Sequence, residues 1–189
     1  MLYVVGDVMA AVTYLDNIMC VVCHGSSAIR LYNTDTLSPL DVVFDVTGMR
    51  DPWDIVVCRH DRQLYVAEEH CIWRVSLDDD SHVKWLTTQF DVRSLSMTSR
   101  HLLVTSEQPP TVQYSTVRQY STTNNELLRV VQLPQFMKDV RHAVETTHGT
   151  FIVCHEGTSQ DKRQDAVSEL LPVTAVNAFN NICAIGLII

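Results

Sequence analysis

The segments Val21-Val22-Cys23-His24, Tyr65-Val66-Ala67-Glu68, Leu103-Val104-Thr105-Ser106 and Ile152-Val153-Cys154-His155 share one pattern and are the basis for predicting the fold. Aligned on Val22, Val66, Val104 and Val153, they lie 44, 38 and 49 residues apart. A second segment rich in apolar residues follows the first three of them: Ile29-Arg30-Leu31-Tyr32, Ile72-Trp73-Arg74-Val75 and Val117-Arg118-Gln119-Tyr120. With one more such segment before and one after, each unit is predicted to form four short strands.

Four antiparallel strands that recur about every 44 residues are typical of β-propeller blades. A β-sandwich also has short, regularly spaced strands, but it does not repeat one four-part unit in the same order. We therefore predict an all-β propeller whose blades start near residues 10, 53, 93 and 141. In this alignment Arg30 and Arg118 are equivalent, and we expect them to brace strands.

Residues 1–171 provide about three complete blades and part of a fourth. Propellers usually close with 4 to 8 blades, and an open array exposes unpaired strand edges. We therefore expect a fragment of a larger, six-bladed ring. The apolar residues 172–189 do not continue the repeat and are expected to be a truncated or disordered tail, or alternatively a capping strand that pairs across the ring.

The second unit resembles an NHL repeat. The resemblance rests on Pro52-Trp53-Asp54-Ile55-Val56-Val57, Leu64-Tyr65-Val66-Ala67-Glu68 and His70-Cys71-Ile72-Trp73-Arg74-Val75. Asp54 stands where that family has glycine. The resemblance implies a propeller that binds proteins or RNA, often found behind the zinc domains of tripartite-motif ubiquitin ligases. It further implies a non-enzymatic scaffold that recruits substrates for ubiquitination within a longer protein.

The composition limits the classes of partner. With 14 Lys and Arg against 22 Asp and Glu, the net charge is −8, which argues against DNA binding and ranks RNA below protein as a partner. The residues after Met1 show no targeting signal, so we expect a cytoplasmic protein whose six cysteines remain thiols. The apolar C-terminal run contains three asparagines and is too short to cross a bilayer, so no membrane contact is expected.

Three motifs that suggest a metal or cofactor have simpler explanations. Cys20-Val21-Val22-Cys23-His24 matches a haem-attachment pattern, but residues three apart on a strand point to opposite faces. His142, Glu145 and His148 lack the spacing of a helical zinc site, and the Asp78-Asp79-Asp80 turn lacks the remaining ligands of a calcium loop. We therefore predict no cofactor and no metal site.

The predicted binding site lies in the loops that lead into the innermost strands. These loops combine aromatic and basic residues, which is the composition of protein interfaces. The predicted partner-binding residues are Arg50, Trp53, Phe90, Arg93, Phe136, Lys138 and Arg141. The alternative is that the three aromatic residues pack between blades.

Two other functions remain open at this point. Asp54 and His142 begin innermost strands, so they could bind a metal in the central channel of a hydrolase or lyase. The loop arginines and aromatic residues could instead bind single-stranded RNA. We favour a non-enzymatic protein-binding scaffold over both.

Overall fold

The computed structural model describes residues 8–98, 100–107, 115–134, 137–156 and 165–170. All the regular structure in these residues is β-strand. The strands are β1 (Met9–Leu15), β2 (Ile18–Cys23), β3 (Ala28–Asn33), β4 (Pro39–Asp45), β5 (Asp54–Cys58), β6 (Gln63–Glu68), β7 (Cys71–Ser76), β8 (His82–Thr87), β9 (Asp91–Met97), β10 (His101–Glu107), β11 (Thr116–Ser121), β12 (Leu127–Gln132), β13 (Lys138–Glu145), β14 (Phe151–Glu156) and β15 (Asp165–Leu170). The described residues contain no helix that could span a membrane.

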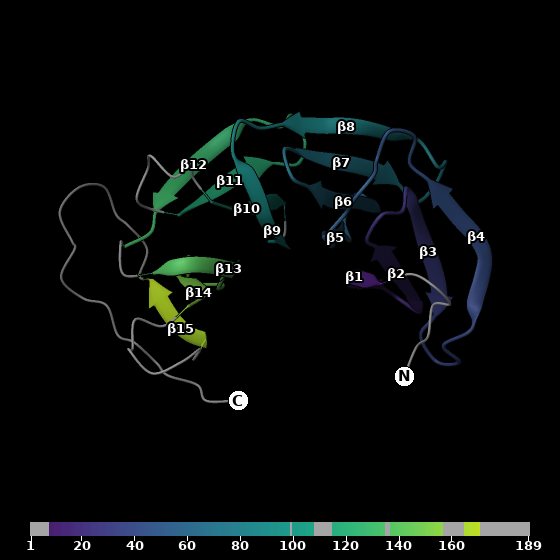
Figure 1. Cartoon of the computed structure of the whole chain (residues 1–189), viewed down its shortest axis with the longest axis horizontal. Helices are drawn as coiled ribbons and strands as arrows, with labels where there is room; N and C mark the ends of the chain where they lie inside the picture. Colours follow the sequence, from purple (N-terminus) through teal and green to yellow (C-terminus); the bar gives the residue numbers. More distant parts are fainter. Residues whose placement is uncertain (1–7, 99, 108–114, 135–136, 157–164, 171–189) are drawn as a thin grey trace.

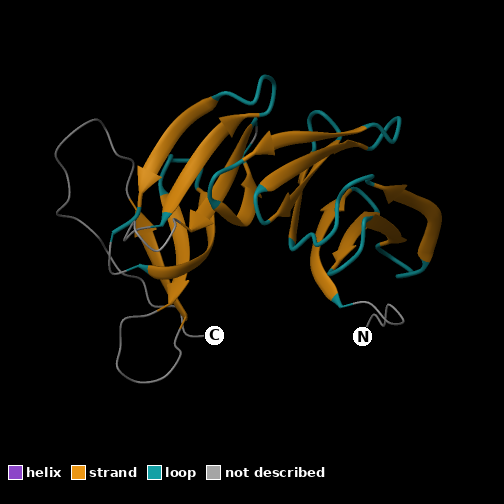
Figure 2. Ribbon diagram, turned by 45° about the horizontal axis from the view of Figure 1, so that its top comes forward, coloured by secondary structure: helices purple, strands orange, loops and turns teal. Residues whose placement is uncertain are grey.

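The strands form three four-stranded sheets and one three-stranded sheet, and within each sheet the strands that are consecutive in the chain pair antiparallel. We call these sheets blades 1 to 4. The first strand of each blade contacts that of the next, so β1, β5, β9 and β13 line the inside of an arc while β4, β8 and β12 lie outside (Figure 1). Short turns join the consecutive strands within blade 1 and within blade 2 (Figure 2). The predicted propeller, with three complete blades and part of a fourth, is confirmed.

The buried apolar residues lie mainly between adjacent blades and do not form a single central core. Because side chains alternate across a strand, each sheet has one apolar face for the preceding blade and one for the following blade. Separate clusters of buried residues fill the junctions between blades 1 and 2, blades 2 and 3, and blades 3 and 4. In the second junction the buried Trp85 contacts Tyr65 and Tyr120 edge to face, with ring centroids 5.1 and 6.0 Å apart. Each blade is therefore stabilised mainly by its neighbours.

The structure corrects one detail of the repeat. Val66 and Val104 pack toward the preceding blade, whereas Val22 packs toward the following one. Val21, which lies on the other face of β2, is therefore the equivalent residue in blade 1. A shift of one residue on a strand reverses the face that a side chain occupies, so the sequence spacing alone gave the wrong valine.

Candidate functional site

The loops that lead into β5, β9 and β13 lie at one end of the blades, because strands alternate in direction along each antiparallel sheet. The β2–β3 and β6–β7 turns lie at the same end. We call this end the loop face. It contains the predicted binding residues that the structure describes, together with several polar residues that the sequence analysis did not select.

The predicted residues of the loop face differ in exposure. Arg50, Arg93 and Arg141 are exposed, while Trp53 and Phe90 are half-buried. Lys138 is the first residue of β13, and Phe136 lies outside the described residues. The three arginine side chains therefore reach solvent, whereas the described aromatic ones are partly covered.

Trp53 enters the junction between blades 2 and 3. Its side chain packs against the buried cluster of that junction, and its backbone N–H donates to the Ala67 carbonyl at 3.1 Å. Pro52, which is buried, restricts the backbone just before it. The indole Nε1 is buried and has no hydrogen-bond partner in the described part of the chain. Trp53 thus combines a packing role with an unused donor.

Phe90 is covered by Arg118. The guanidinium carbon lies 3.9 Å from the Phe90 ring centroid, close enough for a cation–π contact. The same guanidinium donates hydrogen bonds to the hydroxyls of Ser106 and Thr116. Burial lowers the pKa of Arg118. Arg118 therefore braces blade 3, as expected, and limits the face that Phe90 can offer to a partner.

Glu68 organises the segment that carries Arg50, and the sequence analysis missed it. Its carboxylate accepts the backbone N–H groups of Arg50 and Asp51, the latter at 3.1 Å. It also accepts the Trp73 indole N–H at 2.7 Å and the Cys71 thiol at 3.2 Å. Burial alone would raise the pKa of Glu68, but these hydrogen bonds lower it below the usual value. One strand-end carboxylate thus fixes the backbone beneath Arg50.

Two His–Asp pairs join neighbouring blades on the loop face. His24 Nδ1 lies 3.1 Å from Asp51 Oδ1, and His70 Nδ1 lies 3.3 Å from Asp91 Oδ1. Glu69 adds a third group to the second pair, with ligand atoms all within 4.8 Å of one another. Within the described part of the chain, this group of two exposed residues and the half-buried Asp91 could hold a divalent cation. The sequence analysis missed them because Glu69 and Asp91 belong to different blades and meet only at the junction.

Asp54, a candidate channel ligand, acts as a clasp between blades. Its two carboxylate oxygens accept the backbone N–H groups of Ile55 at 2.8 Å and of Leu95, in β9, at 2.7 Å. Burial raises its pKa despite these bonds. His142, the other candidate, lies on β13. The described geometry of Asp54 is that of a strand-end cap shared by blades 2 and 3.

The haem-like motif is divided between two faces of blade 1. Cys20 packs in the junction with blade 2, and Cys23 packs in a separate cluster on the opposite face of the sheet. Neither forms a disulfide, and burial raises the pKa of Cys20 to about 12. The two sulfur atoms therefore cannot attach one ligand.

Comparisons with known proteins support the fold and no closer assignment. No family model matches the chain, and no curated protein matches its sequence. A solved structure of a nidogen/laminin complex aligns with a TM-score of 0.73 at 11% identity, covering 90% of this chain and 63% of that one. The Neurospora crassa Pan2 WD40 domain (TM-score 0.61, 15% identity, 85% and 48% coverage) and the computationally designed Ika8 protein (0.60, 12%, 89% and 47%) align similarly.

The chain spans less than two thirds of each of these structures. At such low identities the likeness concerns the fold alone. Together with the blade topology, it identifies this chain as a β-propeller fold with an open ring in the described residues.

Proposed function

We propose that this chain is a protein-interaction module that binds its partner through the loop face. The observation that carries the proposal is the fixed position of Arg50, which is exposed on a backbone held by Glu68. A side chain presented from an ordered backbone loses less entropy on binding. Arginine beside partly buried aromatic residues is also the composition in which binding energy concentrates.

The resemblance to NHL repeats supports a narrower proposal. Within a longer protein, the module would recruit substrates to a ubiquitin ligase. The nidogen/laminin structure is likewise a complex of proteins, which is consistent with a propeller that acts by binding. Co-expression with candidate ligase domains, followed by measurement of ubiquitin transfer to the bound partner, tests this narrower proposal separately.

The central experiment places a photo-crosslinking amino acid at position 50 of the full chain. Crosslinked proteins are compared with those from a chain that carries the same group at position 35. Asp35 is exposed on the β3–β4 turn of blade 1, at the other end of the blades, and is the matched control. We expect a protein partner crosslinked from position 50 alone and lost with Arg93→Glu. Equal products from both positions, or products that disappear after ribonuclease treatment, would contradict the proposal.

A further inference from the structure

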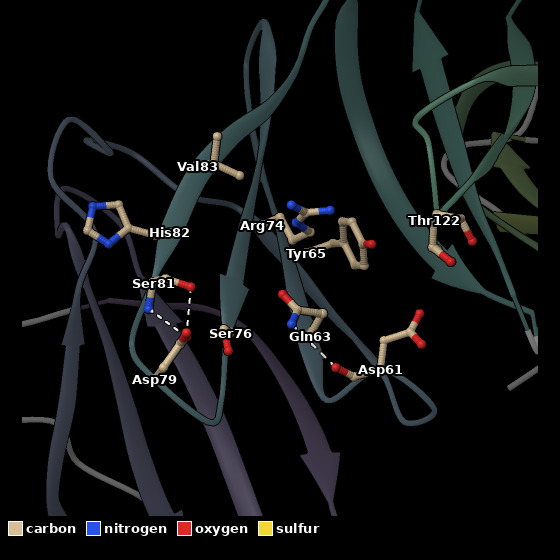
Figure 3. A pocket seen from close by; sticks show the side chains of 11 residues that line it. Asp61, Gln63, Tyr65, Arg74, Ser76, Asp79, Ser81, His82, Val83 and Thr122 are labelled. Carbon is tan, nitrogen blue, oxygen red and sulfur yellow. Dashed lines mark hydrogen bonds between the residues drawn. The ribbon is translucent and has the colours of Figure 1, made fainter.

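A polar pocket lies between blades 2 and 3, at the end of the blades opposite the loop face. Its volume is about 570 Å³, which is within the range of sites that hold small ligands or peptide segments. Figure 3 shows Arg74 and Tyr65 side by side in its middle, with Asp79 and Ser81 on one side and Thr122 on the other. Thr122, in blade 3, faces a wall made by blade 2.

Arg74 is the notable group in this pocket. It is half-buried, lies directly across from Tyr65 in the β6–β7 pair, and forms no ion pair with a carboxylate of the described residues. The two acidic lining residues are engaged elsewhere: Asp61 with His60 at 2.6 Å, and Asp79 with the Ser81 hydroxyl at 2.7 Å. A half-buried guanidinium without a carboxylate is costly unless another group compensates it.

The next blade shows what this position binds. Gln119 lies across from Leu103 just as Arg74 lies across from Tyr65, so the two are equivalent. Gln119 Nε2 donates to the Glu145 carboxylate, from β13 of the following blade, at 3.0 Å. In blade 3 the residue equivalent to Glu145 is Met97. Each ends the first strand of its blade: Met97 pairs with Leu102 of β10, and Glu145 pairs with Phe151 of β14. Arg74 therefore lacks the carboxylate that the chain itself supplies to Gln119.

At the first junction the same two positions carry Leu31 and Val57, which belong to the apolar core between blades 1 and 2. At these two positions, that junction therefore contains no polar side chain that needs a hydrogen-bond partner. Among the three junctions, the one between blades 2 and 3 alone places a charged donor at this position without the matching acceptor. The neighbouring Tyr65 hydroxyl interacts with Arg74, and because burial raises the pKa of Tyr65 to about 12 it stays protonated and can still donate to a second acceptor.

We infer that this pocket binds the carboxylate of a glutamate or aspartate side chain from a peptide segment of a protein partner. Arg74 and the Tyr65 hydroxyl receive the carboxylate where Glu145 lies in the next junction. Asp61 and Asp79 surround the site, so they disfavour further acidic residues and favour a basic residue beside the bound one. The site is at the opposite end from the loop face, and its test does not depend on that face.

The test uses the isotope-labelled full chain and acetylated, amidated Lys-Glu-Lys as the probe, followed by NMR titration. We expect shifts at the amides of Gln63, Ser76 and Thr122, with none at Arg50. Lys-Gln-Lys should bind at least about tenfold more weakly, since it lacks the charged acceptor. Equal affinity for the two peptides would overturn the proposal, and free glutarate binding as tightly as Lys-Glu-Lys would overturn the assignment to a peptide.

Two variants give a second, independent test. Arg74→Gln reproduces the residue found in blade 3 and should remove the preference for Lys-Glu-Lys, while the exposed Arg59→Gln should retain it. Met97→Glu supplies the absent internal carboxylate and should raise the melting temperature and prevent peptide binding. Unchanged peptide binding in Met97→Glu, in a chain that still folds, would contradict the inference.

Discussion

Glu68 connects the stability of blade 2 to the shape of the loop face, because one carboxylate accepts from Arg50, Asp51 and Trp73. Glu68→Gln should lower the free energy of unfolding by about 1 to 2 kcal/mol through loss of these charged hydrogen bonds. The exposed neighbour Glu69 makes none of these contacts, so Glu69→Gln is the matched control. Urea unfolding of both variants measures the difference, and equal losses would refute this role.

The pH dependence of Glu68 has a definite sign. Its pKa is lower in the folded chain, so its contribution is present above the unfolded value and is lost as pH falls through the folded pKa. Wild-type stability should therefore decline on acidification below about pH 4.5, near the usual glutamate value. Glu68→Gln should show a shallower decline in urea unfolding across this range, and parallel pH curves would contradict the prediction.

Trp53 allows size and hydrogen bonding to be separated. Trp53→Ala should lower the free energy of unfolding by about 2 to 4 kcal/mol. The loss should be smaller than for a fully buried tryptophan, because the Trp53 side chain is half-buried in the junction. Trp53→Phe keeps most of the ring and removes an indole N–H that has no described partner. We expect it to cost under about 1.5 kcal/mol in chemical denaturation. A cost for Trp53→Phe as large as that for Trp53→Ala would show that Nε1 makes an essential contact.

At the scale of strands, Asp54 is the residue that ties β5 to β9. Asp54→Ala leaves the Leu95 N–H without its acceptor and should lower stability by about 1 to 3 kcal/mol. Because burial raises the pKa of Asp54, the wild type should gain stability as pH falls through the folded pKa, a gain that Asp54→Ala lacks. A rise in melting temperature with added Ca²⁺ or Zn²⁺ that depends on Asp54 would instead favour a channel metal.

The strands were predictable because their evidence is local: β-branched runs, turn residues and a recurring order. The contacts that define the sites were not, because they form between blades. Glu68 and Arg74 looked like ordinary strand residues, and Met97 gave no sign that it occupies the position of Glu145. The alignment of the repeats also chose Val22 instead of Val21 in blade 1, a shift of one residue. Sequence spacing does not reveal which face of a strand packs against which neighbouring blade.

At the scale of the whole molecule, the main contacts between inner strands in the described residues join adjacent blades: β1 with β5, β5 with β9, and β9 with β13. Such arrays behave as chains of neighbouring units, so the end units open more easily than the middle ones. Amide hydrogen exchange should therefore be slowest in β6 and β10 and faster in β2 and β14, although all four are second strands of their blades. Uniform exchange rates across the four would indicate a single cooperative unit.

The Tyr65, Trp85 and Tyr120 cluster has an optical consequence. Trp85 is buried between two tyrosine rings that belong to different blades, so its electronic environment exists only while blades 2 and 3 remain together. The asymmetric contact between these rings should produce a near-ultraviolet circular-dichroism signal, and the burial of Trp85 away from water should shift its emission toward the blue. Trp85 is thus an intrinsic optical reporter of that junction, in which Trp53 also lies. Its signal would report separation of blades 2 and 3, the two blades that form the polar pocket.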